Sequence, residues 1–252
     1  MTVSTLAEMT ASPAAVSRKR VCEYRDLGRM AYGPAWELQR ELVARRKAGE
    51  ISDRLLFVEH PHVVSMGRNA REQNILASPE MLAQKGIECW ETDRGGDVTY
   101  HGPGQIVCYP IFDLTEWKRD VLAYVRALEQ VMIDAVAEFG ISAGRVTGAT
   151  GVWVAGEKLG AIGVHLSRWV TSHGFALNVS TDLDYFGYII PCGLTKPVTS
   201  MRRLLGEAPP ASDVKRALVG RFGDVFGAAM AERPIAAGGD SVDPQRAGAR
   251  NL

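Results

Sequence analysis

The sequence has few cysteines, no excess of either charge and no long apolar run, and each absence excludes a class of protein. Its 252 residues include 29 Lys and Arg and 29 Asp and Glu, whereas proteins that bind nucleic acid through charge usually have a basic excess. No stretch approaches the roughly 18 consecutive apolar residues of a membrane-spanning helix. We therefore expect neither nucleic acid nor a membrane among its partners.

The cysteines are too sparse for a disulfide-stabilised scaffold. The chain has 4 of them, none in a C-x-x-C pair, and the histidines and cysteines lack the spacing of zinc ligands. Residues 1–20 hold a few basic residues but no apolar segment of a secretory signal. A mitochondrial presequence is the weaker alternative there, because Glu8 is present and arginines are few. We expect a reducing, cytoplasmic location and no bound metal.

We expect one catalytic domain over residues 21–232. Residues 1–20 have the composition of a disordered N-terminal extension. Residues 233–252 are dominated by Ala, Gly, Asp, Pro and Arg, which predicts a disordered C-terminal tail. The length suits a single large domain with a substantial core. No internal repeat or linker divides the part between the two tails.

Periodicity predicts hairpin strands mixed with a few helices. Apolar residues at helical spacing, together with capping and terminating residues, predict helices at 31–47, 79–85, 120–139 and 212–228. Short apolar runs bounded by turn residues predict strands at 55–58, 87–91, 106–112, 152–154, 159–164 and 175–179. This order predicts an α+β fold with a mixed, largely antiparallel sheet.

The first unusual segment runs from Arg94 to Gln105 and contains two pairs of glycines. Glycines let a backbone approach a ligand closely and leave its N–H groups accessible. Arg94 can bind a carboxylate, a phosphate or a carbonyl group. The segment has neither the P-loop nor the Rossmann glycine pattern. Two turns around a strand, with His101 as an ordinary polar residue, would explain the same composition.

The second unusual feature is Cys192, which stands between a proline and a glycine after an apolar run. This context predicts a turn that presents the thiol. A nucleophilic cysteine needs thiolate character, and therefore a nearby cation or base. Burial as a small core residue is the alternative. It is the interpretation favoured for Cys89 and Cys108, which lie in apolar strand patterns, while Cys22 lies near the predicted ragged N-terminus.

Spacing alone does not identify the group that would activate this thiol, because such partners meet in space rather than in sequence. The candidates are Lys158, Lys196, His101, His165 and His173. An exposed charge in a hairpin turn is the alternative interpretation of Lys158, which follows a glycine and a glutamate.

Several of these segments, in this order, resemble the octanoyltransferases of lipoate synthesis. The resemblance covers residues 22–206. It rests on Glu59-His60-Pro61, the stretch from Arg94 to Gln105, Lys158 to Gly163, His173 to Val179 and Pro191-Cys192-Gly193. It implies the fold of biotin- and lipoate-protein ligase catalytic domains, which is a central mixed, largely antiparallel sheet flanked by helices. His165 stands where the family pattern leads us to expect arginine.

The resemblance implies an acyltransferase that needs no cofactor. Its donor would be octanoyl-acyl carrier protein, and its acceptor a specific lysine of a lipoyl domain or of the glycine-cleavage H protein. Cys192 would carry the acyl group as a thioester, and Lys158 would move protons. The implied substrate contacts are Arg94, Gly95, Gly96, Asp97, Val98, Thr99, Tyr100, His101, Ala161, Ile162, Gly163, Gly174, Phe175 and Ala176.

Three other functions stay open at this point. An ATP-dependent lipoate or biotin ligase has the same fold but needs no nucleophilic cysteine. An amidotransferase would move octanoyl between two lipoyl-type proteins through the same cysteine. A non-catalytic acyl-binding or carrier-docking module would use Cys192 only structurally. For an acidic carrier protein, we expect contacts from Arg45, Arg46 and Lys47.

Overall fold

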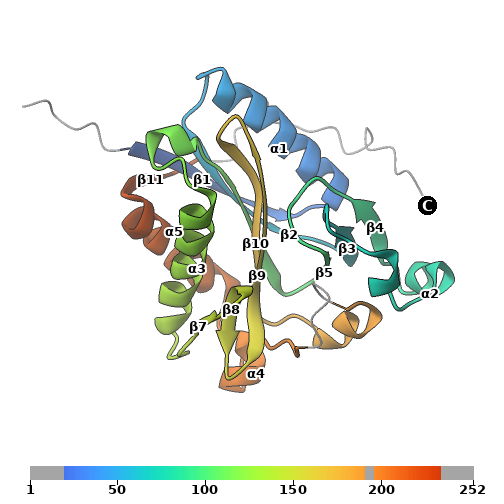
Figure 1. Cartoon of the computed structure of the whole chain (residues 1–252). Helices are drawn as coiled ribbons and strands as arrows, with labels where there is room; N and C mark the ends of the chain where they lie inside the picture. The colour runs from blue at the N-terminus through green and yellow to red at the C-terminus, as the bar shows by residue number, and fades with distance from the viewer. Residues whose placement is uncertain (1–19, 191–195, 234–252) are drawn as a thin grey trace, which may run out of the picture.

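A computed structural model of the protein describes residues 20–190 and 196–233. Its main feature is an eight-stranded mixed sheet with the order β11-β1-β2-β6-β10-β9-β8-β7, drawn in Figure 1. The strands are β1 (Arg20–Arg29), β2 (Asp53–Glu59), β6 (Gln105–Ile111), β7 (Gly144–Val146), β8 (Ala149–Val154), β9 (Glu157–Ser167), β10 (Val170–Asn178) and β11 (Ala228–Glu232). Strand β1 runs parallel to both β2 and β11, and the other pairs are antiparallel.

A smaller three-stranded sheet has the order β4-β3-β5. It consists of β3 (Val63–Met66), β4 (Glu88–Glu91) and β5 (Val98–His101). Its core includes Val64, Leu82, Val98 and Tyr100. Helix α2 (Pro79–Gln84) packs there through Leu82, and the side chain of Ser78 accepts a hydrogen bond from the Met81 N–H at its start.

Helices cover both faces of the large sheet (Figure 1). Helix α1 (Tyr32–Lys47) packs on one face through Ala35, Leu38 and Leu42. Helices α3 (Val121–Ala137) and α5 (Ala211–Phe226) pack together on the other face. The other short helices are α4 (Met201–Leu205) and 3₁₀ helices at Glu72–Asn74, Leu114–Glu116 and Leu183–Tyr188.

Capping and turn residues lie at the ends of the helices and in the β8–β9 hairpin, as their types lead us to expect. Asp120 caps α3 by accepting a hydrogen bond of 2.9 Å from the Ala123 N–H, as expected of an N-cap aspartate. Gly227 ends α5 with a φ of 64°, a conformation that favours glycine. The β8–β9 hairpin turns at Ala155 and Gly156, whose φ angles are 47° and 86°. Two positive values are typical of the type I′ turn that suits a two-residue hairpin.

The predicted fold class is confirmed, but the sequence does not predict β1, β3, β7 or β11. Strands β1 and β11 pair with each other at one edge of the large sheet. Cys22, expected near a ragged N-terminus, is fully buried on β1. The predicted disorder of the two tails concerns residues that lie almost wholly outside the described ranges, and it stays a prediction.

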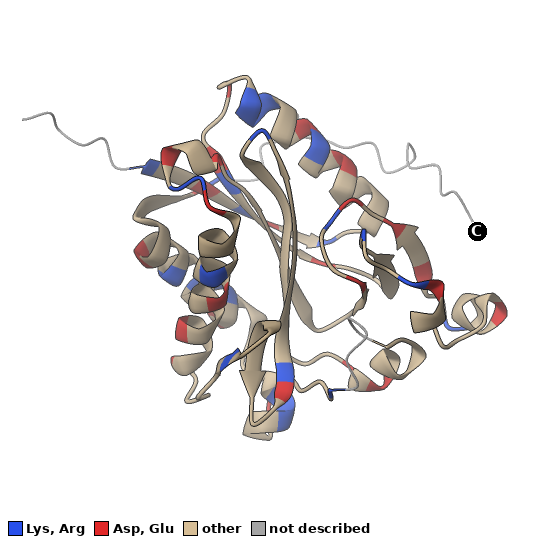
Figure 2. Ribbon diagram, viewed as in Figure 1, with Lys and Arg blue, Asp and Glu red and all other residues tan. Residues whose placement is uncertain are grey.

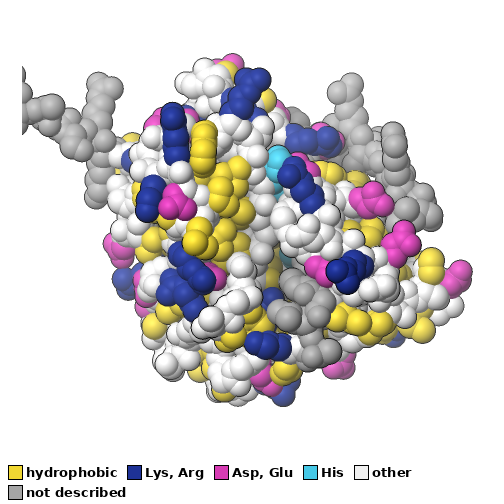
Figure 3. All heavy atoms as spheres, viewed as in Figure 1, with side chains coloured by type: hydrophobic (Ala, Val, Ile, Leu, Met, Phe, Trp, Pro, Cys, Tyr) yellow, Lys and Arg dark blue, Asp and Glu magenta, His cyan; other side chains and the backbone are white. Residues whose placement is uncertain are grey.

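Charges of both signs are spread over the molecule. Figure 2 shows them on the helices, and Figure 3 shows them separated by apolar and uncharged side chains on the visible surface. Helix α1 carries the exposed pair Glu37–Arg40. This mixture agrees with the balanced composition, 29 basic against 29 acidic residues. Within the described part of the chain, no helix has both the length and the apolar character needed to cross a membrane.

One ion-pair cluster is buried beneath the end of α1. Asp53 is 1% exposed, and its carboxylate pairs with Arg20 and with Arg46, whose Nε is 2.9 Å from Oδ1. Arg46 also reaches Glu116 at 2.7 Å. The expectation that Arg46 meets an acidic carrier is therefore wrong, because its guanidinium is buried and already paired.

Candidate functional site

An apolar pocket lies between the two sheets, where the glycine-rich segments meet. Its wall is made by the start of α1, the loop before β5, and strands β5, β6, β9 and β10. Most of the predicted substrate contacts line it: Arg94, Gly96, Thr99, His101, Ala161, Ile162, Gly163, Gly174, Phe175 and Ala176. The structure thus brings together three segments that are far apart in the sequence.

Two glycines explain how the backbones come so close at this pocket. A Cβ at Gly174 would lie 2.1 Å from the backbone oxygen of Cys108, and one at Gly163 would lie 2.9 Å from the Gly95 oxygen. Neither distance leaves room for a side chain. The Gly95 N–H donates a hydrogen bond of 2.8 Å to the Val164 oxygen, which fixes the glycine-rich loop against β9.

Four of the predicted contacts lie elsewhere. Gly95 holds the loop to β9, as just described. Asp97 Oδ2 accepts a hydrogen bond of 2.6 Å from the Asn74 amide. Val98 and Tyr100 are fully buried in the core of the small sheet. Side chains alternate along a strand, so Thr99 and His101 face the pocket while Val98 and Tyr100 face away from it.

Arg94 is buried at the edge of the pocket, with its guanidinium held by protein groups. Its Nε donates to Ser65 Oγ at 3.1 Å, and Nη2 donates to both the hydroxyl and the backbone oxygen of Ser65. Its Nη1 donates to the Gly95 oxygen at 3.1 Å. A buried guanidinium with fixed donors can act as an immobile positive charge beside the pocket.

Lys158 lies in a second, smaller cavity that shares Thr99, Ala161 and Ala176 with the first. The residue is 7% exposed, so the interpretation as an exposed hairpin charge is wrong. Its Nζ lies 4.9 Å from the ring centroid of Trp153, a cation–π distance. Burial places the Lys158 side chain inside the protein, among Thr99, Gln105 and Asn178, rather than in solvent.

The backbone of Lys158 pairs with the chain that follows Cys192. The Lys158 N–H donates to the Pro197 oxygen, and the Thr199 N–H donates to the Lys158 oxygen, both at 2.9 Å. The Lys196 Nζ lies 5.1 Å from the Trp153 ring. Cys192 itself lies outside the described residues, so its predicted role stays a prediction.

Three histidines near the pocket are buried, and burial favours the neutral form of each ring. Burial lowers the pKa of His60 to about 4 and that of His101 to about 3. Burial also lowers the pKa of His173, although the neighbouring Asp93 acts in the opposite direction. A neutral imidazole has one donor and one acceptor nitrogen, so each of these rings has a defined hydrogen-bonding direction.

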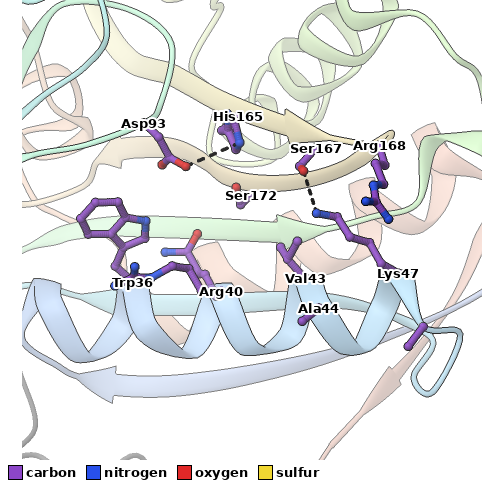
Figure 4. A pocket seen from close by; sticks show the side chains of 12 residues that line it. Trp36, Arg40, Val43, Ala44, Lys47, Asp93, His165, Ser167, Arg168 and Ser172 are labelled. Carbon is purple, nitrogen blue, oxygen red and sulfur yellow. Dashed lines mark hydrogen bonds and ion pairs between the residues drawn. The ribbon is translucent and has the colours of Figure 1, made fainter.

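Asp93 connects the glycine-rich loop to two histidines beside an open groove of about 660 Å³, drawn in Figure 4. Its Oδ1 is 2.7 Å from His173 Nε2, and its Oδ2 is 3.5 Å from His165 Nε2. The hydrogen bond from His173 is the main cause that lowers the pKa of Asp93 to about 2. His165 stands where the family pattern leads us to expect an arginine. An arginine is next to it, because Arg68 Nη2 lies 2.9 Å from His165 Nδ1.

Four residues of the pocket wall were not predicted from the sequence: Tyr32, Val107, Tyr109 and His173. The sequence offers His173 as a candidate base for Cys192 and not as a substrate contact; it has a φ of 55° within β10. Val107 and Tyr109 lie within the predicted strand 106–112, and strand alternation places them on one face. Tyr32 reaches the site only through the packing of α1.

Comparison with known proteins identifies the family. Residues 31–223 match the lipoyl protein ligase A/B catalytic domain. The chain belongs to this family. Its relatives include an octanoyltransferase of Solibacter usitatus, 58% identical over 82% of this chain and 94% of the relative. An octanoyltransferase of Koribacter versatilis is 54% identical over 80% of this chain and 82% of the relative. The resemblance found in the sequence is thereby confirmed.

Solved structures of this family and of biotin protein ligases share the fold. A bi-partite lipoate protein ligase of Thermoplasma acidophilum aligns with a TM-score of 0.67 at 15% identity, over 85% of this chain and 88% of that one. A biotin protein ligase of Aquifex aeolicus in complex with biotin and ATP aligns with a TM-score of 0.51 at 14% identity, over 81% and 70%. At such identities the likeness concerns the fold alone, and it confirms the predicted architecture.

Proposed function

We propose that this member of the lipoyl protein ligase A/B family is an octanoyltransferase of lipoate biosynthesis that works through Cys192. Octanoyl would pass from the thioester of an acyl carrier protein to Cys192, and then to the amine of an acceptor lysine. Relatives that are 58% and 54% identical bear the name octanoyltransferase. They support octanoyl transfer by an acyltransferase enzyme. The cysteine intermediate is our own inference.

The observation that carries this proposal is the position of Lys158. It is buried next to the apolar pocket, and its backbone pairs with residues 197 and 199. Those residues follow Cys192 closely in the sequence. A buried lysine whose backbone pairs with residues a few positions after the candidate nucleophile is a suitable candidate for its base.

The proposed chemistry has two balanced steps. In the first, the Lys158 amine takes the Cys192 thiol proton, and the thiolate attacks the donor carbonyl. The C–S bond to the carrier breaks, and the leaving thiolate takes the proton back from Lys158. In the second, the acceptor amine attacks the acyl-enzyme. The Cys192 thiolate leaves, and the amine loses a proton to Lys158, which returns it to the thiolate. A thioester is exchanged for a thioester and then for a more stable amide, so no nucleotide is required.

The pocket next to Lys158 is the proposed site of the acyl chain. Its lining is mainly apolar, and each buried methylene contributes about 0.8 kcal/mol to binding. Its volume is about 40 Å³, far below the roughly 300–1,000 Å³ of pockets that hold drug-sized ligands. We therefore expect lining side chains to move when a medium-length chain enters. Arg94 and the backbone of the glycine-rich segments would orient the carbonyl end.

The acceptors that we propose are lipoyl domains and the H protein, with octanoyl-acyl carrier protein as the donor. The bi-partite lipoate protein ligase of T. acidophilum is described with its E2 lipoyl domain, which supports an acceptor of that kind. A nucleophilic thiolate is best preserved in a reducing compartment, and this supports a cytoplasmic location. No metal or organic cofactor enters the proposed steps.

The test is transfer of octanoyl from its carrier protein to a lipoyl domain in the absence of ATP. We expect transfer by the wild type and at least a 1000-fold loss in Cys192→Ala, since the covalent route is then closed. The matched control is Cys89→Ala, which removes a half-buried thiol from the small sheet. A Cys192→Ala variant that still transfers at the wild-type rate, or a wild type that needs ATP, would show a ligase instead.

A further inference from the structure

A network of buried polar side chains lies behind the pocket, and it begins at Arg94. Arg94 Nη2 lies 3.0 Å from Oγ of Ser65, which is fully buried on β3. Since a guanidinium can only donate hydrogen bonds, Ser65 Oγ is an acceptor here. Its own hydroxyl hydrogen stays available for another partner. Ser65 Oγ is 3.3 Å from Nε2 of His101.

Backbone carbonyl groups, which can only accept, fix the opposite end. Asn178 Nδ2 donates to the Thr199 oxygen at 3.0 Å, so Oδ1 of Asn178 must face the other way. There it accepts from Gln105 Nε2 at 2.9 Å. The same nitrogen lies 3.3 Å from the Tyr100 oxygen. Both contacts require the Gln105 amide to turn its Nε2 toward Asn178 and its Oε1 toward His101.

The two ends together determine the state of His101. Its Nδ1 lies 2.7 Å from Gln105 Oε1, an acceptor, so Nδ1 carries the hydrogen. Burial lowers the pKa of His101 to about 3, so the ring is neutral and its Nε2 accepts the Ser65 hydroxyl hydrogen. Every donor therefore points the same way, from Arg94 toward Thr199. All the side chains that form the network are buried, where two facing acceptors would be costly.

The network joins the two sheets across the site. Ser65 and His101 belong to β3 and β5 of the small sheet, whereas Gln105 and Asn178 belong to β6 and β10 of the large sheet. Thr199, at its far end, donates its N–H to the Lys158 oxygen at 2.9 Å. The network thus extends from the guanidinium on one side of the pocket to the backbone of Lys158 on the other.

We propose that Ser65, His101, Gln105 and Asn178 are positioning residues for acyl transfer, and that their one-directional network holds Arg94 and the Lys158–Thr199 backbone pair in place. The inference rests on the proposed function. These residues act through the groups that they hold. A displacement of about 1 Å at a catalytic group can cost about 100-fold in rate, so a network of this kind is needed even where its members do not react.

The first experiment reads the network directly and requires no activity. We would label the histidine rings with ¹⁵N and record long-range ¹H–¹⁵N correlations near neutral pH. His101, assigned by its loss in His101→Gln, is expected as a neutral ring with the hydrogen on Nδ1. In Gln105→Leu, which removes the acceptor at Nδ1, the hydrogen is expected to move to Nε2. A charged His101, or one with its hydrogen on Nε2 in the wild type, would overturn the proposal.

The second experiment measures the single-turnover rate of acyl-enzyme formation from octanoyl-carrier protein. Ser65→Ala breaks the network near Arg94, and Asn178→Asp removes the donor to Thr199 while keeping the shape. We expect each to slow acylation at least 10-fold without weakening carrier binding. The double variant should be little slower than the slower of the two single variants. Either substitution alone interrupts the network, so the second one has little left to remove.

Thr171→Val is the matched control for loss of a buried hydroxyl. Thr171 is fully buried on β10, where its Oγ1 donates to the Pro110 oxygen at 2.7 Å and accepts from the Phe112 N–H at 2.9 Å. It lies outside the network, so we expect lower stability at an unchanged acylation rate. Acylation at the wild-type rate in Ser65→Ala and Asn178→Asp would refute the positioning role. Absence of an acyl-enzyme in the wild type would instead refute the proposed function.

Discussion

The free energy of unfolding of this protein should begin to fall at about pH 6, which is well above the pH at which carboxylates titrate. The cause is a set of histidines buried in their neutral form at its centre. His60 is fully buried, with Nδ1 2.8 Å from the Met30 oxygen and Nε2 2.7 Å from the Tyr109 hydroxyl. Burial lowers its pKa from 6.5 to about 4, and it lowers that of His101 from 6.5 to about 3. In the unfolded chain both rings would take up a proton below pH 6.5.

The magnitude follows from linkage. A group whose pKa is lower in the folded state contributes stability above its unfolded pKa, and this contribution is lost as the pH falls toward the folded value. At about pH 5, each ring is charged only when unfolded, which lowers the free energy of unfolding by about 2 kcal/mol per ring and about 4 kcal/mol together. Total stabilities of 5–15 kcal/mol are typical, so the loss is large. The pKa of Asp93 is lowered to about 2, so its contribution is lost only in stronger acid.

The assay is urea unfolding followed by tryptophan fluorescence at several values between about pH 8 and pH 5. Below about pH 6 we expect the free energy of unfolding to fall by up to ~2.7 kcal/mol per pH unit. In His60→Gln, which has one such ring fewer, the slope should be smaller by up to ~1.4 kcal/mol per pH unit, whatever its stability at pH 8. A free energy of unfolding that is the same at pH 5 and pH 8 would refute the reasoning.

Three further outcomes follow from the geometry. Lys158→Met, which keeps the bulk of the side chain but not its amine, should slow acyl-enzyme formation by about 100-fold or more at unchanged carrier affinity. Equal rates in a quenched-flow experiment would contradict the role of Lys158. Gly174→Ala would place a Cβ 2.1 Å from the Cys108 oxygen, so we expect the free energy of unfolding to fall by more than about 4 kcal/mol. This loss would be visible as a lower melting temperature or as insoluble protein, and a melting temperature equal to that of the wild type would contradict it. Asp53→Ala leaves Arg20 and Arg46 without their shared carboxylate and should cost about 3–5 kcal/mol, and a urea midpoint equal to that of the wild type would disprove this.

The helices and central strands were predictable because their signals are local. The stripe of apolar residues and the Asp120 cap define α3, and a continuous apolar run defines β2, which is buried on both faces. Strand β1 was missed because charged residues interrupt it. It forms by pairing with β2 and with β11, which lies some 200 residues away, and no sequence window contains such a pairing.

The sequence predicts which segments form the site, but only partly which of their side chains face the pocket. Glycine-rich motifs identified the three segments that form the pocket. Strand alternation over 98–101 would have separated Thr99 and His101 from Val98 and Tyr100, had the segment been treated as a strand. Tyr32 carries no local signal of a site, because its place there depends on how α1 packs. Asn178 lies in a segment that carries the resemblance, but its place in the site depends on where β10 ends.

The central claim is that Cys192 holds the octanoyl group during transfer, and the most direct measurement is the intact mass of the protein. Wild type incubated with octanoyl-carrier protein alone should gain the mass of one octanoyl group, and neutral hydroxylamine should remove it. Cys89→Ala should gain the same adduct, and Cys192→Ala should gain none. Transfer to a lipoyl domain without any such adduct, or an equal adduct on Cys192→Ala, would contradict the account.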